Sequence, residues 1–318
     1  MMEMKFKTPA PLYRDPVFDG AADPVIIYNH LEKEWWMIYT QRRAVLSVVG
    51  VSSSHGTALG VASSDDGGVN WIYRGILNLS IDRGHNTFWA PEIIYEEKTQ
   101  TYHMYTTYIR GVPYKWGQSK RGGIAHFTSK NLWDWDFESF IARQRQGIID
   151  ACVHVLPNGK YRMWFRGKGC STCAMDSEDL YNWGDPFLAV DDEQAEGPNV
   201  FHFKGYYWLI TDPLGHRHGL AVYRSSNLDH WEKQGYILQD KSIRPLDNSP
   251  GRHADVCVSG DNAYIVYFTQ PYKDYLEKTD FEKLPNIDYN RCVIQVAKLD
   301  VIEGKLACNR NENFLISL

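Results

Sequence analysis

The chain has 318 residues, a formal net charge of −5 and no long basic run, so the sequence argues against a nucleic-acid partner. It has no apolar stretch near 18 residues, which argues against a membrane span, and no apolar segment follows Met1–Lys5 to form a signal peptide. We therefore expect a cytoplasmic protein, or a periplasmic or secreted one if a signal peptide has been removed. The six cysteines include a lone CxxC at Cys170 and Cys173, without the second pair that a zinc site needs, and we expect reduced structural thiols.

A repeated unit runs along the whole chain. Each unit begins with a short segment that carries one acid, and these segments are Ala22–Ile27, Ala90–Ile94, Ile149–Val153, Glu196–Val200 and His253–Cys257. About ten residues later an aromatic strand follows, beginning at Trp35, Tyr102, Tyr161, Tyr206 and Tyr264. The acids recur with a mean spacing of 58 residues between Asp23 and Asp255. Repeats of this size made of short strands are typical of propeller blades.

A third element recurs in the first four units, where a Ser/Asn/Asp turn precedes a tryptophan. We expect these tryptophans to begin an outer strand and to pack between blades; they are Trp71, Trp135, Trp183 and Trp231. The fifth unit instead has a polar insertion over residues 273–290, which we interpret as a lid or a partner contact. The sequence thus predicts one all-β domain over residues 1–318, a five-bladed β-propeller in which the N-terminal residues are candidates to complete the last sheet.

The first strand of a propeller blade lines the central channel, so five acids at one repeat phase would converge at one mouth. Hydrolysis of a glycosidic bond requires a proton donor and a carboxylate on the opposite face of the sugar. Asp23, with small neighbours that leave room for water, and the longer Glu196 fit such an inverting pair. Asp150, in an apolar setting, is the third acid, and we expect like-charge repulsion to raise the pKa of Glu196 and keep it protonated.

These segments resemble glycoside hydrolase family 43, whose members are five-bladed propeller enzymes. Asp23-Pro24 resembles the segment of the general base, Ile149-Asp150 that of the pKa-modulating Asp, and Glu196-Gly197-Pro198 that of the general acid. Trp89-Ala90-Pro91-Glu92 resembles the second-blade motif, and His253 matches a histidine near the axis. Arg14-Asp15-Pro16 is a competing candidate for the base. Asp255 is an extra acid relative to the family, and we expect no C-terminal sandwich of the kind that many members carry; both differences indicate a divergent branch.

The resemblance implies an inverting, exo-acting glycosidase on plant or algal oligosaccharides, similar to arabinosidases and xylosidases. It implies no required cofactor, and it places an optional structural calcium ion on the axis with His253 as its candidate ligand. Candidate substrate-binding residues are Trp89, Glu92, His154, Trp164, Arg166, Asn199, Arg252, His253 and Asp255. Two alternatives remain open: a propeller phosphorylase or an anhydrogalactosidase-like enzyme in which a histidine is the acid, and a non-catalytic sugar-binding propeller.

Overall fold

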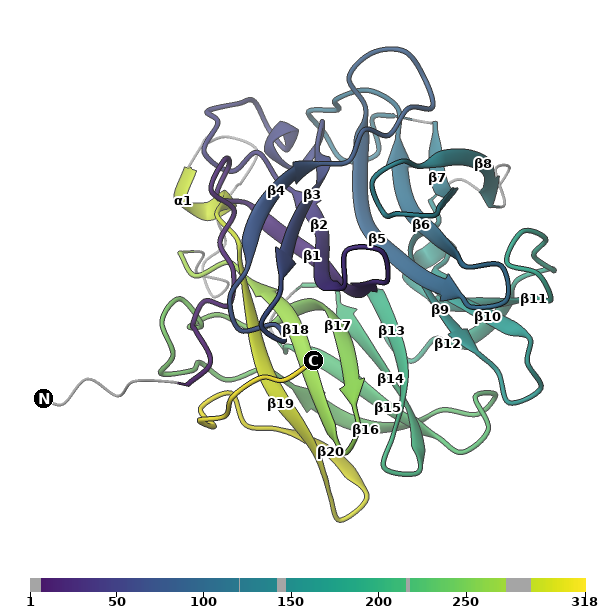
Figure 1. Cartoon of the computed structure of the whole chain (residues 1–318), viewed down its shortest axis with the longest axis vertical. Coiled ribbons are helices and arrows are strands. Elements are labelled where there is room, and N and C mark those ends of the chain that lie inside the picture. Colours follow the sequence, from purple (N-terminus) through teal and green to yellow (C-terminus); the bar gives the residue numbers. More distant parts are fainter. Residues whose placement is uncertain (1–6, 120, 142–146, 216–217, 273–286) are drawn as a thin grey trace, which may run out of the picture.

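The computed structural model describes residues 7–119, 121–141, 147–215, 218–272 and 287–318. In these residues the strands form five four-stranded antiparallel sheets, which are arranged as blades in a ring (Figure 1). The first strand of each blade contacts the first strands of the two neighbouring blades, so these five strands surround the axis. The predicted five-bladed β-propeller is therefore confirmed.

Each blade uses four consecutive strands. Blades one and two comprise β1 (Ala21–Asn29), β2 (Glu34–Gln41), β3 (Ala58–Ser64), β4 (Ile72–Ile76), β5 (Thr87–Glu96), β6 (Thr101–Ile109), β7 (Gly122–Ser129) and β8 (Asp136–Ile141). Blade three comprises β9 (Ile149–Val155), β10 (Tyr161–Arg166), β11 (Thr172–Ser177) and β12 (Phe187–Val190). Blades four and five comprise β13 (Ala195–Phe203), β14 (Tyr206–Pro213), β15 (Leu220–Ser225), β16 (Glu232–Ile237), β17 (Arg252–Ser259), β18 (Asn262–Thr269), β19 (Val293–Ile302) and β20 (Lys305–Cys308). The described helices are a short α-helix, α1 (Ile287–Asn290), and two 3-10 turns, η1 (Ser52–Ser54) and η2 (Lys168–Cys170).

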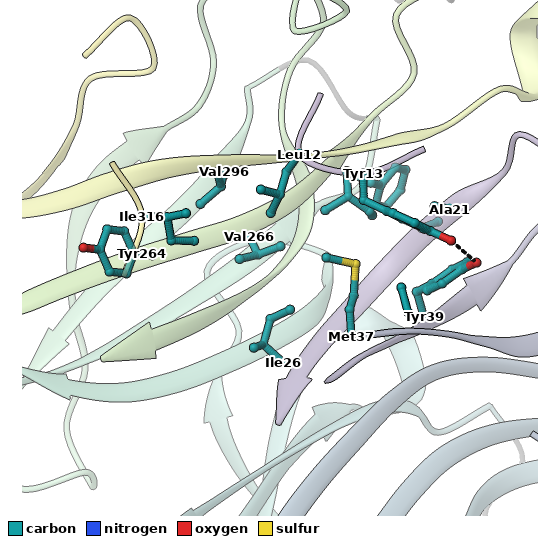
Figure 2. Close-up of a cluster of buried hydrophobic side chains, with 14 of the residues drawn as sticks. Leu12, Tyr13, Ala21, Ile26, Met37, Tyr39, Tyr264, Val266, Val296 and Ile316 are labelled. Atoms are coloured by element: carbon teal, nitrogen blue, oxygen red, sulfur yellow. Dashed lines mark hydrogen bonds between the residues drawn. The ribbon is translucent and has the colours of Figure 1, made fainter. Parts of the chain in front are cut away.

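The hydrophobic core consists of clusters between adjacent blades. Figure 2 shows the cluster between blades five and one, where Met37 and Ile26 of blade one face Val266 and Val296 of blade five. The predicted interblade tryptophans pack against clusters of this kind, with Trp71 on the blade five–one cluster, Trp135 on one–two, Trp183 on two–three and Trp231 on three–four. Burial of these apolar faces fixes each blade against its neighbours, because a single sheet cannot cover its own apolar faces.

The ring closes through both chain ends. The fifth sheet already contains four strands from residues 252–308, and the described N-terminal residues add two isolated bridges, an antiparallel one between Tyr13 and Ile294 and a parallel one between Gly20 and Cys292. The C-terminal segment also reaches from blade five to blade one, since Leu318 donates a backbone hydrogen bond to the carbonyl of Gly67 in blade one. The N-terminal residues therefore brace the last sheet at its edge and do not complete it. The predicted insertion at 273–290 lies outside the described residues except for α1.

Candidate active site

All five inner strands are interrupted at the same place by a β-bulge. Two residues of the inner strand oppose one residue of the second strand, and the pairs are Asp23-Pro24, Ala90-Pro91, Asp150-Ala151, Gly197-Pro198 and His253-Ala254. The first residue of each pair has a left-handed backbone, with φ of 49°, 44°, 59°, 55° and 24° in that order. Proline suits the second position in three blades because a bulge leaves that residue without a ladder hydrogen bond to donate.

In blades two to five, the left-handed residue turns its N–H toward the preceding blade. The N–H groups of Ala90 and Asp150 donate to the hydroxyls of Thr40 and Thr107 at 2.9 and 3.0 Å. The remaining two such bonds run to carboxylates, from Gly197 to Asp150 at 3.2 Å and from His253 to Asp212 at 3.3 Å. Non-glycine residues in this conformation carry strain that the surrounding structure must offset. These four bulges are therefore held by interblade hydrogen bonds, and the side chains beside them are fixed in direction.

The bulge phase corrects the prediction that five acids occupy one repeat position. Only Asp23 and Asp150 stand at the bulge itself, and Glu196 precedes it by one residue. Glu92 and Asp255 follow it by two residues, which places them roughly 6.6 Å farther along the strand. The acids therefore occupy two levels of the channel. We call Asp23, Asp150, Glu196 and His253, together with Arg42, Arg166 and Arg252, the mouth cluster. The deep ring is our name for the residues that stand two positions after the first bulge residue in blades two to five, namely Glu92, Cys152, Asn199 and Asp255.

Asp23 lies on β1 and is buried in the mouth cluster. Its Oδ1 is 3.4 Å from Nη2 of Arg42 and 3.6 Å from Nδ1 of His253. The His253 ring in turn rests on Gly197, where a Cβ atom would come within 2.8 Å of the imidazole. Glycine is thus required at 197 both for its φ and for the close approach of this ring. Blades one, four and five together fix the Asp23–His253 pair.

Asp150 is the buried acid at the centre of the cluster. It is 4% exposed and accepts the N–H of Gly197. Burial raises the pKa of Asp150 from 3.8 to about 7, a rise that His253 and Arg166 oppose and that Glu196 and Asp23 reinforce. This carboxyl can therefore hold a proton near neutral pH, because its low-dielectric surroundings penalise the charged form.

Glu196 lies on β13 between two arginines. Its Oε2 is 3.0 Å from Nη1 of Arg166, and its Oε1 is 3.4 Å from Nη2 of Arg252. Arg252 also contacts Asp212 at 3.2 Å. The sequence led us to expect neighbouring acids to dominate around Glu196. The structure instead places a guanidinium beside each of its oxygens.

Asp15, the competing candidate for the base, belongs to a structural turn. Its Oδ1 accepts the N–H groups of Val17 and Phe18, and its Oδ2 accepts from the side chains of Tyr39 and Gln41. These contacts satisfy both oxygens at the edge of blade one. Asp15 therefore lies apart from the mouth cluster, and Asp23 is the acid of the two Asp-Pro motifs that meets Asp150 and His253.

The predicted substrate-binding residues divide into three groups. Trp89, Arg166, Arg252 and His253 lie at the mouth, since each is at or next to the bulge level of its blade. Glu92, Asn199 and Asp255 belong to the deep ring. Trp164 is 0% exposed and packs against Trp231 between blades three and four, which contradicts a sugar contact. His154 lies four residues beyond Asp150 on β9, roughly 13 Å along the strand, and packs against Tyr207, so it too is remote from the mouth.

The deep ring fastens blades to one another. Glu92 accepts the N–H of Val153 at 2.7 Å, and Asp255 accepts the N–H of Ile26 at 2.9 Å. Asn199 donates its amide to Asp255 at 3.0 Å. Burial, and after it the charge of Asp255, raises the pKa of Glu92 well above its usual range. The ring lines a cavity of about 260 Å³, whose lining residues include no acid of the mouth cluster.

Sequence reasoning missed Arg42, Asp212 and Thr107. All three stand at or just beyond the mouth end of a second strand, where Thr107 lies opposite Trp89 and Asp212 opposite Glu196. A signal was available in the repeated pattern of Pro or Ala, any residue, then Val or Ile, which begins at residues 24, 91, 151, 198 and 254. Aligning the units on this pattern gives the position of the bulge in each inner strand. It thereby points to the polar and charged residues at the facing end of the second strand.

Among the described residues, no three His, Cys, Asp or Glu side chains are placed to hold a metal ion, so the axial calcium ion stays a prediction. No helix in the described parts of the chain is long and apolar enough to cross a membrane.

A five-bladed propeller with carboxylates and arginines gathered where its inner strands begin has close structural counterparts. No protein-family model matches the sequence, and no curated protein matches it. A thermostable family-43 glycoside hydrolase matches in structure with a TM-score of 0.67 at 19% identity, over 95% of this chain and 97% of that one. A family-43 β-1,3-galactosidase with galactodeoxynojirimycin matches with a TM-score of 0.67 at 13% identity, over 95% and 98%. A family-43 β-xylosidase/α-arabinofuranosidase from a compost microbial metagenome, in complex with xylotriose, matches with a TM-score of 0.68 at 12% identity, over 96% and 97%. The chain has the fold of the family-43 glycoside hydrolases.

Proposed function

We propose that this chain is an inverting, exo-acting glycoside hydrolase that acts on plant or algal oligosaccharides. The observation that carries the proposal is the convergence of Asp23, Asp150 and Glu196 from three different blades on one mouth cluster. Asp150 accepts the N–H of Gly197, the residue after Glu196, and the His253 ring that rests on Gly197 lies 3.6 Å from Asp23. The fold shared with xylosidases, arabinofuranosidases and galactosidases supports the same class of reaction.

The proposed mechanism is a single displacement. Asp23 takes a proton from a water molecule as the water oxygen bonds to the anomeric carbon. The bond from that carbon to the leaving oxygen breaks, and Glu196 gives its proton to the leaving oxygen, so the sugar product has the inverted configuration. Arg42 and His253 orient Asp23, and Arg166 and Arg252 stabilise Glu196 as its negative charge appears. Asp150 fixes Gly197 and thereby the backbone next to Glu196.

A second candidate assigns the proton donor to His253, as in an anhydrogalactosidase-like enzyme. Both oxygens of Glu196 face arginines, whereas the His253 imidazole lies beside Asp23 and rests on Gly197. An imidazolium at this place could protonate a leaving oxygen while Glu196 anchors sugar hydroxyls through Arg166. Both candidates use Asp23 as the base, and they differ in whether Glu196 or His253 protonates the leaving oxygen. Loss of turnover in His253→Gln with retained turnover in Glu196→Gln favours the histidine, and the reverse result favours Glu196.

The test of the proposal is a panel of nitrophenyl pentosides and hexosides and of natural xylo-, arabino-, galacto- and agar-derived oligosaccharides. Each substrate is incubated with and without inorganic phosphate, and the first-formed sugar is followed by proton NMR before mutarotation. Release of an inverted sugar in water supports hydrolysis. Strict dependence on phosphate indicates a phosphorylase, and retention of configuration makes Asp23 a nucleophile. Binding without release indicates a sugar-binding propeller.

A further inference from the structure

A wall of aromatic side chains rises from the mouth cluster to the protein surface between blades one and two. Trp89, one residue before its bulge, stands at the strand level of Glu196 in blade four. The His55 ring lies 4.9 Å from Trp89 and 5.2 Å from Trp116, and the two indoles are 6.0 Å apart. Trp116 is 62% exposed, whereas His55 is buried. The rings therefore form a continuous track that begins beside the candidate chemistry and ends in solvent.

The wall is held in place by two loops that are bonded to each other. Val51 in the β2–β3 loop donates its N–H to the carbonyl of Tyr114 in the β6–β7 loop at 3.1 Å. Gly50, with φ of 57°, packs so closely on that carbonyl that any Cβ atom would collide with it. Arg43 donates from Nε to the carbonyl of His55 and from Nη2 to that of Ser52, at 2.9 and 2.6 Å. The rings thus sit on a prearranged support, which lowers the entropy cost of binding.

The chemistry of the track suits a sugar rather than an anion or a metal. Nε1 of Trp89 donates to the carbonyl of Ser54 at 2.6 Å, which fixes the plane of its indole. Nδ1 of His55 donates to the carbonyl of Val51 at 3.0 Å, and burial lowers the pKa of His55, which favours the neutral imidazole. Flat, uncharged rings present apolar faces that match the C–H faces of pyranose and furanose rings. An exposed indole on a loop that is held in this way can offer its face to such a sugar, and aromatic residues of this size carry most of the energy where they bind.

We infer that Trp116 forms a second sugar-binding position that receives the leaving-group side of the oligosaccharide. This inference rests on the proposed exo action, because the terminal sugar then occupies the mouth cluster and the remaining sugars extend outward along the wall. The position therefore raises the affinity for chains of two or more sugars above the affinity for the monosaccharide. It is a specificity residue remote from the reacting atoms.

The test uses the Asp23→Asn protein and ladders of xylo-, arabino- and galacto-oligosaccharides of one to four units, with affinity measured by calorimetry. We expect the affinity of Asp23→Asn to rise with chain length. Adding Trp116→Ala should lower the affinity for the longer chains about tenfold. Affinity for the monosaccharide should not change, and Trp116→Phe should restore most of the loss. Tyr236→Ala, which removes another exposed aromatic side chain on β16, is the matched control and should leave the rise intact.

Several outcomes overturn the inference. They are an unchanged length dependence in Trp116→Ala, a loss of monosaccharide affinity as large as that of the longer chains, and the absence of binding by every ladder. A change in oligomeric state on Trp116→Ala, measured by light scattering with no change in sugar affinity, assigns the wall to a contact between copies. Failure of the proposed function gives a different result. The wild type then releases no sugar, whether or not binding of the ladders depends on Trp116. Normal hydrolysis with no role for Trp116 leaves the function standing and removes only the second position.

Discussion

The acids of the mouth cluster and those of the deep ring lie on inner strands of the propeller only two or three residues apart in level, yet they do different work. At the mouth, carboxylates face side chains that carry charge: Arg42 and His253 at Asp23, and Arg166 and Arg252 at Glu196. In the deep ring, Glu92 and Asp255 accept backbone N–H groups from the next blade. Acids that face charged side chains at the mouth are placed to exchange protons with a ligand, whereas acids that hold backbone amides stabilise the ring. The comparison predicts that mutations at the mouth remove activity and mutations in the deep ring remove stability.

The largest expected effect is on turnover. Asp23→Asn should lower kcat/KM about 10²–10⁴-fold, because an amide cannot accept the proton from water. The fold should survive, since the side chain keeps its shape. Steady-state kinetics on the substrate found in the panel, together with thermal denaturation, measures both. Asp15→Asn is the matched control from the other Asp-Pro motif, and it should change stability rather than turnover at a temperature where it is folded. Near wild-type turnover in Asp23→Asn removes Asp23 from the mechanism.

The next largest effect is a pH dependence of the free energy of unfolding, which arises from Asp150 in the mouth cluster. The pKa of Asp150 rises from 3.8 to about 7 on folding, so between these values the native state holds a proton that the unfolded state has lost. Its contribution to the free energy of unfolding is therefore largest below pH 4 and falls as pH rises to 7, by about 4 kcal/mol at roughly 1.36 kcal/mol per pKa unit. Asp150→Asn should flatten this slope and be relatively more stable at pH 8.

Urea titrations at several pH values measure this slope, with the exposed Asp261→Asn on the β17–β18 hairpin as the control that should leave it unchanged. A wild-type slope that persists in Asp150→Asn contradicts the assignment of the buried proton to this residue.

The deep ring should respond in stability. Asp255→Ala deprives the N–H groups of Ile26 and Val256 and the amide of Asn199 of their acceptor, and an unsatisfied buried donor costs about 1–3 kcal/mol. We expect the free energy of unfolding to fall by about 3 kcal/mol, less than additively, while kcat per folded molecule stays within a few-fold. Asp255→Asn keeps one acceptor oxygen and should lose less. The comparison fails if Asp255→Ala unfolds like the wild type but has lost its turnover.

The smallest expected effect concerns Cys152, the deep-ring member of blade three. Its Sγ accepts the N–H of Val200 at 3.1 Å, and sulfur is a weak acceptor. Cys152→Ala should lower the free energy of unfolding by about 1 kcal/mol beyond the loss seen in Cys257→Ala, which removes a thiol from the same cavity. Equal losses in the two variants, measured by denaturant unfolding, indicate that Cys152 only fills space.

The blades could be predicted from the sequence because their signals are local. An aromatic strand follows each acid-bearing segment, and a Ser/Asn/Asp turn followed by a tryptophan recurs where an outer strand begins. The candidate site was predicted less completely. Asp23, Asp150 and Glu196 do meet, but Glu92 and Asp255 lie two residues deeper, and Trp164 and His154 face neighbouring blades. The error came from aligning the units on their acids instead of on the Pro/Ala-x-Val/Ile pattern that marks the bulge.

The sequence by itself determined the number of blades, the inner strands and the acids that begin them, because strand period and turn chemistry depend on neighbouring residues. Only the tertiary structure decided which acids share a level, since a bulge adds one residue and moves each later side chain along the axis. It also decided the partners. Arg42, Arg166 and Arg252 come from the ends of different strands, and the charges that surround Asp150 come from four blades. Burial and charge pairing depend on distances across the ring, which the order of residues along the chain does not contain.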